Sequence, residues 1–482
     1  MLHRDLSKSL SLPMLVALGA AGVLGTSWVY TASDFFAKYG AGGEIFGLGI
    51  AGLLAVSVAL AYAELAARFP RAGGELVFAY AAFGRRLAFV AGWLLIGAYV
   101  SSLAFYVTAS GMLLAILIPA LNSLPLYSVA GTEICLPVLA FGIVLALAVL
   151  GFTAFGMQLA GRLQLLLFAA MLLIGLTLAL VGFITGSSDH FWPAFTPDQD
   201  PIYSTLRFVL PAMTFLTGFS LVSALAEDAD LSPRRIAQAV LATVLTAAAF
   251  YCTVLLATAW VIPWQTTAGL KDGVIDAFRH AGYPDLAWGA YGIAVLGLLT
   301  SFLALFSAAS RVILALARAD LLPPLLARLT PAGRPINALL FTLMLTLGLG
   351  WLGKGALLWF LDTGGVYIGL AWFIAVLSMY RIRRLYPEQH SPYVVRPDWL
   401  PVLGGGVALL IIVATLLPGT ALSLVWPQEY LILFGWLLLG AFLYQLALGG
   451  SDAAGLAAVL GSRWPLRPSG ASVTDGHSRR QR

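Results

Sequence analysis

Long apolar runs separated by short polar segments make up most of the chain. A helix that crosses the hydrocarbon core of a bilayer needs about 20 apolar residues, at a rise of roughly 1.5 Å per residue. Twelve runs are long enough, and they cover approximately residues 12–30, 45–67, 87–118, 134–152, 163–186, 204–226, 239–262, 287–312, 336–352, 356–380, 400–418 and 428–449. The pattern therefore predicts an all-α polytopic membrane protein with twelve transmembrane helices.

The composition supports a membrane protein. Of the 482 residues, 60% are hydrophobic and 10% are charged, whereas soluble domains have about 25% charged residues. The N-terminus is basic and is followed by the apolar run at 12–30. Signal peptides have the same arrangement. This run is long, lacks a small-residue cleavage site and is followed by many similar runs, so we interpret it as the first span.

The basic residues indicate an orientation. If the N-terminus is cytoplasmic, 22 of the 27 Lys and Arg residues fall on the inner side. The outer loops then contain Lys38, Arg207, Lys271, Arg279 and Lys354. Because cytoplasmic loops are rich in Lys and Arg, both termini are predicted to be cytoplasmic in a multi-pass protein of the cell membrane, of the bacterial inner-membrane type. Orientation then accounts for the net charge of +5, so the lipid bilayer, and no nucleic acid, is the expected partner.

Two spans contain residues that interrupt helices. The first has glycines at positions 19, 22 and 25, and the sixth has Pro211 and Gly218 among several hydroxyl residues. The alternatives are a glycine packing stripe in the first span and a proline kink with self-bonded hydroxyls in the sixth. The two interruptions correspond if the first ten spans form two repeats of five helices, and paired interruptions are typical of a transporter substrate site.

A broken helix exposes N–H groups that favour a carboxylate and C=O groups that favour an ammonium group. A zwitterionic amino acid carries both. The residues predicted to form the pocket backbone are Gly22, Val23, Leu24, Gly25, Thr26, Ser27, Thr214, Phe215, Thr217, Gly218, Phe219 and Ser220. The side chains predicted to line it are Tyr99, Ser102, Tyr106 and Tyr367. Phe215 and Phe219 form an aromatic gate in one interpretation and ordinary packing in the other.

Three stretches resemble one known family. Residues 62–75 read YAELAARFPRAGGE and are followed by Phe83-Gly84 and Gly92-Trp93. Together with residues 218–236 and 310–323, they are similar to the amino acid–polyamine–organocation transporters over roughly residues 10–385. The resemblance implies a leucine-transporter-like fold with a five-plus-five inverted repeat, two extra helices, and a site between the first and sixth spans that opens by alternating access.

The implied organisation has six parts. The two repeats cover 12–186 and 204–381, and an outer loop at 187–203 joins them. A cytoplasmic N-terminus at 1–11 precedes the first repeat. The loop and last two helices occupy 382–449, and a disordered cytoplasmic tail occupies 450–482, where Ser, Gly, Pro and Arg are frequent.

The sequence departs from the family pattern at three positions. Ser27 stands where the first-span motif usually has a further glycine, which leaves less room beside a carboxylate. Ser220 stands where the family commonly has glutamate, so an acidic coupling or gating group is missing there. Met171 lies where some proton-coupled members have a lysine, so an ammonium group in place of sodium is not expected at that position.

A few polar residues are candidates for ion coupling or gating. Asp362 lies about seven residues into the tenth span, where an ionisable group is a functional candidate; the alternative is an N-cap before a later helix start, with residues 363–365 in the loop. Ser307 and Ser310 either form a sodium site with first-span carbonyls or bond to their own helix. Glu64 is expected to pair with a basic residue of an inner gate.

Acidic residues also follow the sixth span. Glu227, Asp228 and Asp230 are interpreted as a solvated inner loop, with gate salt bridges as the alternative.

Other function classes fit the sequence less well. All five histidines fall in loops or tails, and neither they nor the two cysteines have metal-ligand spacing, so an enzyme is not expected. A repeated pore motif is missing, which disfavours a channel. We expect a secondary active transporter of an amino acid, neutral rather than cationic, or of a related amine, coupled to H⁺ or Na⁺ and needing no cofactor. An exchanger and a non-transporting nutrient sensor are the alternatives, and a monomer and a homodimer are both open.

Overall fold

The computed structural model describes residues 6, 8–129, 131–197, 199–352, 356–387, 391–420, 423–447, 455, 457 and 459–460. The side chains of Thr132, Leu210, Thr214, Thr217, Leu357, Leu358 and Leu361 are outside this description. Apart from four residues, the tail at 450–482 also lies outside the described residues, and its disorder stays a prediction.

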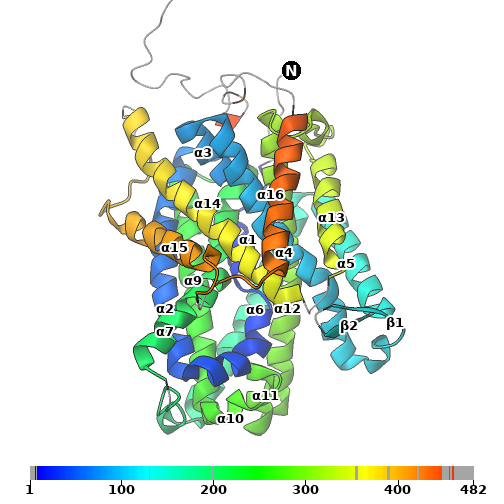
Figure 1. Ribbon diagram of the computed structural model, residues 1–482, viewed down its shortest axis with the longest axis vertical. Coiled ribbons are helices and arrows are strands. Elements are labelled where there is room, and N and C mark those ends of the chain that lie inside the picture. Colours follow the sequence, from blue (N-terminus) through cyan, green and yellow to red (C-terminus); the bar gives the residue numbers. More distant parts are fainter. Residues whose placement is uncertain are drawn as a thin grey trace, which may run out of the picture.

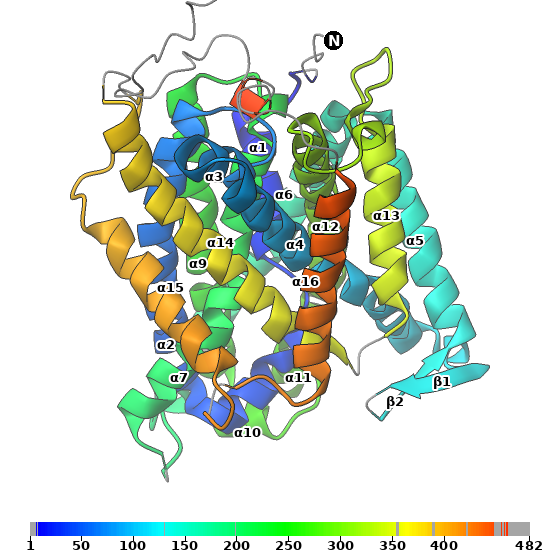
Figure 2. The same cartoon turned by 45° about the horizontal axis from the view of Figure 1, so that its top comes forward.

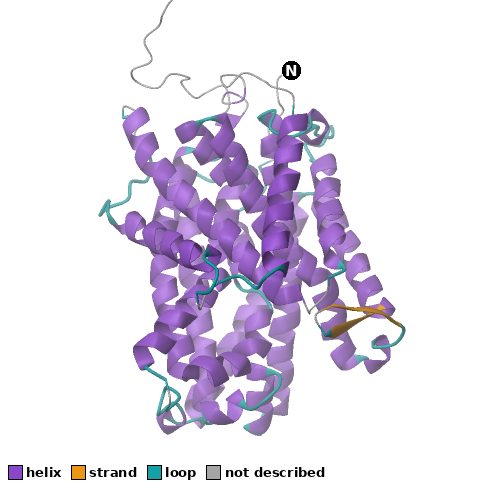
Figure 3. Cartoon of the chain, in the orientation of Figure 1, coloured by secondary structure: helices purple, strands orange, loops and turns teal. Residues whose placement is uncertain are grey.

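The described chain is a bundle of helices with one small hairpin (Figure 3). The first repeat region contains α1 (Leu12–Val23), α2 (Ser27–Arg68), α3 (Glu75–Phe83), α4 (Arg85–Leu117), β1 (Pro125–Val129), β2 (Thr132–Cys135), α5 (Leu136–Phe155) and α6 (Met157–Thr185). The second contains α7 (Pro201–Phe215), α8 (Ser220–Ala224), α9 (Pro233–Val261), α10 (Trp264–Ala268), α11 (Gly273–His280), α12 (Pro284–Arg318), α13 (Ile336–Gly350) and α14 (Leu357–Leu385). The last two helices are α15 (Leu400–Leu416) and α16 (Gln428–Leu446).

Length and apolar composition make this a polytopic membrane protein. Among the described residues, eight helices are long and apolar enough to cross a bilayer, and α1, α13 and α15 are shorter apolar helices. Large apolar side chains are exposed on the outer helices, as lipid contact requires; examples are Leu173, Leu180, Leu410 and Phe442. The exact number of twelve spans and the inverted repeat stay predictions.

One expected loop is wrong. The segment between the first two predicted spans, residues 31–44, is helical, and α2 runs through it with a kink at Gly40, where φ is 74°. The polar residues Asp34 and Lys38 are exposed on one face at helical spacing, so they mark a polar stripe and not a loop. A β-carbon at Gly40 would lie 2.8 Å from the carbonyl oxygen of Ala194, so a later loop packs directly against this kink.

The arrangement of the helices defines two ends of the bundle. In Figures 1 and 2, α3 lies at one end, near the start of α1, and α10 lies at the other; we call them the α3 end and the α10 end. Helix α2 packs against α7 and α9, and α4 packs against α12 and α14. The hairpin β1–β2 lies at one edge of the bundle, and Tyr127 on β1 donates a hydrogen bond to the carbonyl oxygen of Trp351 at 2.6 Å.

Candidate substrate site between two broken helices

The first interruption is a break between α1 and α2. Helix α1 ends at Val23, and Leu24 has a non-helical ψ of 70° before α2 begins at Ser27. Side chains replace the lost helical hydrogen bonds: the Tyr251 hydroxyl donates to the Val23 carbonyl oxygen at 2.6 Å, and the Ser301 hydroxyl donates to that of Ala21 at 2.5 Å. The backbone can therefore leave the helical conformation here, because side chains of neighbouring helices donate hydrogen bonds to its carbonyl oxygens.

The second interruption lies between α7 and α8. Helix α7 contains Pro211 and ends at Phe215, and a 3₁₀ turn at Thr217–Phe219 leads into the short α8. The two breaks touch through Gly218, because a β-carbon there would lie 2.3 Å from the Gly22 carbonyl carbon and from the Val23 nitrogen. Only a glycine permits this approach of backbone to backbone.

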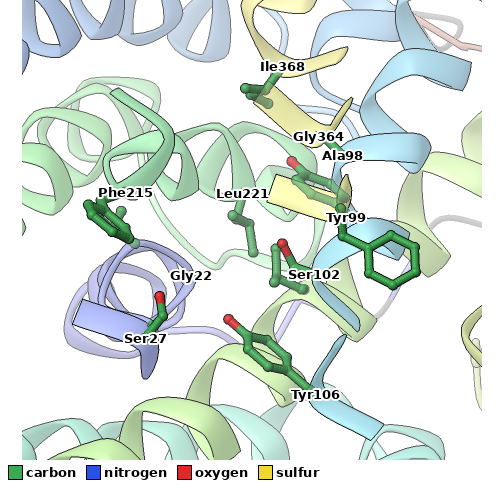
Figure 4. Close-up of a pocket in the computed structure, with 14 residues that line it drawn as sticks. Gly22, Ser27, Ala98, Tyr99, Ser102, Tyr106, Phe215, Leu221, Gly364 and Ile368 are labelled. Carbon is green, nitrogen blue, oxygen red and sulfur yellow. The ribbon is translucent and has the colours of Figure 1, made fainter. Parts of the chain in front are cut away.

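A cavity lies beside the two breaks. Its empty volume is about 650 Å³, counting the part that is open to solvent. The residues that line it are Gly22, Val23, Gly25, Ser27, Ala98, Tyr99, Ser102, Tyr106, Phe215, Leu221, Leu305, Phe360, Gly364 and Ile368. Figure 4 shows Tyr99, Ser102 and Tyr106 on one side of the cavity, and Gly22, Ser27 and Phe215 on the other. None of the described lining residues is Asp, Glu, Lys, Arg or His.

Half of the residues predicted for the pocket line this cavity. They are Gly22, Val23, Gly25, Ser27, Tyr99, Ser102, Tyr106 and Phe215. Leu24 and Thr26 are buried away from it, Gly218 lies between the two backbones, and Ser220 shares a hydrogen bond with the lining residue Tyr99 at 2.9 Å. The side chains of Thr214 and Thr217 lie outside the described residues.

Two aromatic residues lie elsewhere. Phe219 is fully buried, with its ring centroid 5.2 Å from that of Tyr62 and 5.1 Å from that of Trp372. It therefore packs between α2 and α14, and the aromatic gate over the cavity is wrong for Phe219. Tyr367 does not line the cavity either, because its ring packs near Trp436 with centroids 6.3 Å apart.

The serines proposed for sodium have other partners. Ser307 donates to the Leu303 carbonyl oxygen and Ser310 to that of Ser307, each at 2.7 Å within α12. These bonds favour the alternative in which both hydroxyls bond to their own helix, and a sodium site at these serines stays a prediction. Ser301, six residues before Ser307 on the same helix, does donate to a first-span carbonyl oxygen, that of Ala21.

Asp362 lies in the second turn of α14, which begins at Leu357, so the alternative that placed it in a loop is wrong. The residue is exposed and does not line the cavity, although Phe360 and Gly364 do. Residues two apart on a helix point in different directions, so the Asp362 side chain points away from the cavity. Its carboxyl group lies beside that of Glu429 at the start of α16. A role for Asp362 in coupling stays a prediction.

Sequence reasoning missed six of the lining residues. They are Ala98, Leu221, Leu305, Phe360, Gly364 and Ile368. Helical periodicity contains part of this information, because Ala98, Ser102 and Tyr106 recur every four residues on α4, as Phe360, Gly364 and Ile368 do on α14. The sequence does not show which face of α14 is turned towards α1.

Buried ion pairs close the α3 end of the bundle. Arg311 contacts Asp228 at 2.9 Å, Arg318 contacts Glu227 at 3.0 Å, and Arg383 contacts Glu64 at 2.5 Å. Glu64 thus pairs with a basic residue. Glu227 and Asp228 are 4% and 1% exposed, so their interpretation as a solvated loop is wrong, whereas Asp230 is exposed. Glu227 and Asp228 directly follow α8 and lie against α12, whose arginines replace water as partners.

The N-terminal segment adds to this closure. The Leu6 N–H donates to one carboxylate oxygen of Glu227 at 3.1 Å, and the Ala72 N–H donates to the other at 3.0 Å. Burial opposes the charge, but Arg318 and these two N–H groups hold the pKa of Glu227 below its usual range. Leu10 is fully buried, and its N–H donates to the Asp228 carbonyl oxygen at 3.0 Å. Segments far apart in sequence therefore meet on Glu227 and Asp228.

A side chain at Gly25 is expected to fill the cavity. A β-carbon there would lie 3.3 Å from the Tyr106 hydroxyl oxygen and meet nothing else within 4 Å. Gly25→Leu should therefore fold, but should lower the affinity for a cavity ligand at least tenfold, with Gly25→Ala milder. Equilibrium binding and the melting temperature measure this. Unchanged binding by Gly25→Leu would show that the ligand occupies another site.

Comparison with known proteins gives the family. The sequence model of the amino acid permease family matches residues 10–442. The branched-chain amino acid permease BcaP of Lactococcus lactis is 25% identical over 419 residues, which are 83% of this chain and 88% of that protein. The methylthioribose transporter of Bacillus subtilis is 24% identical over 84% of this chain and 88% of its own length.

A human relative matches less completely. Cationic amino acid transporter 4 of Homo sapiens is 27% identical over 66% of this chain and 50% of its own length. These relatives are permeases and transporters, not enzymes, and the match of the family model covers both broken helices. It confirms the resemblance found in residues 62–75 and in the later motifs. The chain belongs to the amino acid permease family.

Proposed function

We propose that this permease is a secondary active transporter that carries a neutral amino acid by alternating access, with its substrate in the cavity beside the two broken helices. The observation that carries the proposal is the cavity lining: backbone from the α1–α2 break, residues from both sides of the α7–α8 break, and hydroxyls from α4, without an acidic or basic side chain among the described lining residues.

The polar parts of the lining match the two charged groups of an amino acid. Ser27 and Trp28 open the long helix α2, so their N–H groups lie at its positive end and favour the substrate carboxylate. The Tyr106 and Ser102 hydroxyls stand across the cavity. The end of α7 at Phe215 supplies carbonyl groups of the negative helix end for the ammonium group. The substrate therefore lies across the junction of the two breaks.

The apolar parts of the lining favour an uncharged side chain. Leu305, Phe360 and Ile368 line the cavity beside the polar groups, and a cationic side chain would lose its hydration there without a carboxylate to replace it. The likeness to a branched-chain amino acid permease supports this choice. The likeness to cationic amino acid and methylthioribose transporters makes the substrate class the point to test.

The buried ion pairs at the α3 end indicate a step of the transport cycle in which this end is closed. The excess of Lys and Arg on one side of the predicted spans supports a cytoplasmic location for the α3 end. The buried ion pairs of Glu64, Glu227 and Asp228 then form the cytoplasmic gate. Opening the cavity to the cytoplasm requires these pairs to separate, while the N-terminal segment, α8 and α12 move relative to one another.

Counterflow in proteoliposomes tests this function. The purified protein is reconstituted, the vesicles are loaded with unlabelled L-leucine, L-alanine, L-phenylalanine, L-arginine or putrescine, and uptake of the same labelled compound is measured. We expect transient accumulation for at least one neutral amino acid and none for L-arginine or putrescine. Uptake that requires internal substrate would identify an exchanger. Binding without flux for every compound would contradict transport.

A further inference from the structure

Glu75 is a buried carboxyl group that the substrate site does not use. It is the first residue of α3, outside the helices long enough to cross the bilayer, and it is fully buried. The Tyr62 hydroxyl donates to Oε1 of Glu75 at 2.7 Å. Oε2 is also buried and has no hydrogen-bond partner among the described residues. An unpartnered buried oxygen is costly in a carboxylate, whereas a proton on it removes the charge.

The groups around Glu75 do not supply a compensating charge. Arg311 and Arg318 of α12 pair with Asp228 and Glu227. On α14, Arg383 pairs with Glu64, and Arg381 donates to the Ala82 carbonyl oxygen.

In the described part of the chain, the remaining titratable neighbours of Glu75 are phenols: Tyr62 of α2 and Tyr99 of α4. Ser223 of α8, beside Gly74, adds only a hydroxyl. Burial raises the pKa of Glu75 to about 7, against the hydrogen bond from Tyr62 and the backbone N–H that favour the charged form.

A short chain of contacts links Glu75 to the cavity. Tyr62 bonds to Glu75 and packs against Phe219 of the second break, with ring centroids 5.2 Å apart. Tyr99 lies within electrostatic reach of Glu75, lines the cavity and bonds to Ser220. Both routes end at residues 219–220, where the second break becomes α8.

The segment that carries Glu75 is attached to the cytoplasmic gate. The Ala72 N–H donates to Glu227 at 3.0 Å, and the Gly73 N–H donates to the Ala224 carbonyl oxygen at 3.3 Å. A β-carbon on Gly74 would lie 2.8 Å from the Ser223 hydroxyl oxygen. Separation of this segment from α8 would let water reach Glu75.

We propose that Glu75 is a proton-binding site whose occupancy is coupled to closure of the α3 end. The proton binds to Oε2 when the gate is closed, giving a neutral acid that still accepts from Tyr62. When the gate opens, water solvates the carboxylate and the proton leaves from the same atom. The coupling ion of the transport cycle is then H⁺, and this assignment rests on the proposed function.

The direction of the pH dependence follows from the two states. The closed state binds the proton up to a pH of about 7, whereas a hydrated glutamate has an ordinary pKa near roughly 4.3. Raising the pH between these values therefore favours opening, by up to about tenfold per pH unit. Above about 7 neither state binds the proton, and the effect levels off.

Thiol labelling measures opening without a substrate. Ser223→Cys is placed in a chain whose Cys135 and Cys252 are replaced by serine, because residue 223 is 1% exposed beneath Gly74. N-ethylmaleimide labelling is compared at pH 5.5 and 7.5 with and without Glu75→Gln. For each chain, the labelling rate at pH 7.5 is divided by the rate at pH 5.5. Comparing this quotient between the two chains cancels the pH dependence of the thiol itself. Between pH 5.5 and pH 7.5, we expect the labelling rate to increase on the order of tenfold more in the chain with Glu75 than in the Glu75→Gln chain.

Two further variants sharpen the test. Tyr62→Phe removes a hydrogen bond that lowers the pKa of Glu75, so its labelling should level off at a higher pH. Glu44→Gln is the matched control, because Glu44 is another buried carboxyl with an unpartnered oxygen on α2. It should keep the pH dependence. An unchanged pH dependence in Glu75→Gln, or its loss in Glu44→Gln alone, would overturn the proposal.

A flux measurement separates this proposal from the proposed function. The neutral amino acid with the largest counterflow is used to follow substrate-driven proton entry with a pH dye inside the vesicles. Glu75→Gln should keep counterflow and lose proton entry. If no compound shows counterflow, the transport function fails, while the labelling result still decides the role of Glu75. Proton entry that persists in Glu75→Gln would contradict the role of Glu75 alone.

Discussion

Gly218→Ala is expected to weaken substrate binding and to impair transport. The added β-carbon would lie 2.3 Å from the Gly22 carbonyl carbon and from the Val23 nitrogen, and 2.7 Å from the Gly22 carbonyl oxygen. These atoms are backbone on both sides, so no side-chain rotation relieves the overlap, and the two breaks must move apart. Overpacking of this kind costs about 1–3 kcal/mol, and the displacement falls on Gly22 and Val23, which line the cavity.

The measurement is equilibrium binding of the transported amino acid, together with the melting temperature. We expect affinity to fall by at least about tenfold, since each 1.4 kcal/mol is a factor of ten. Gly348→Ala is the matched control, because a β-carbon at this helical glycine of α13 meets nothing within 4 Å. Binding by Gly218→Ala equal to that of the unmodified protein would show that the two breaks need not touch.

Asp228→Asn is expected to cause the largest loss of stability. Asp228 accepts two hydrogen bonds from Arg311, at 2.9 and 3.1 Å, and the two side chains are 2% and 3% exposed. The substitution keeps the shape but leaves a buried guanidinium group without its counter-charge. Removal of one partner of such a pair costs about 3–5 kcal/mol, so the melting temperature in detergent should fall markedly.

A double variant separates charge from packing. Asp228→Asn combined with Arg311→Met removes both charges, and it should recover much of the lost melting temperature, because a pair without charges carries no uncompensated desolvation cost. Arg279→Ala is the control, since the Arg279–Asp276 pair has a half-exposed arginine and should contribute little. A double variant less stable than Asp228→Asn would contradict the assignment of the loss to the unpaired Arg311.

The helices were predictable from sequence because their cause is local. Apolar runs of sufficient length occur in every span, and glycine and proline mark both breaks at α1 and α7. The exceptions are the short helices α3, α10 and α11, which lie between predicted spans, and the segment at 31–44, where polar residues suggested a loop. Asp34 and Lys38 belong to a helical stripe, and the kink at Gly40 packs against the distant residue Ala194, a contact that the local pattern does not show.

The cavity was only partly predictable because its walls come from seven helices, α1, α2, α4, α7, α8, α12 and α14. The breaks and the hydroxyls of α4 follow from local pattern, whereas Phe360 and Ile368 depend on how α14 is rotated. Ser307 and Ser301 illustrate the same limit: both lie on α12, and only the fold shows which one faces α1.

Buried charges were the least predictable feature. Glu227 and Asp228 are next to each other in a sequence that resembles a solvated loop, and their partners Arg318 and Arg311 lie 91 and 83 residues away. Glu75 and Tyr62 are separated by only 13 residues, but they lie on different helices. Pairing across elements depends on tertiary contacts that hydropathy does not encode.

An experimental structure with a bound neutral amino acid tests the central claim most directly. We predict density in the cavity with the carboxylate at the start of α2, near Ser27, and with the side chain towards Leu305, Phe360 and Ile368. The Gly22–Gly218 contact should be retained. Density for the amino acid at any other position, with this cavity empty at saturating concentration, would contradict the account.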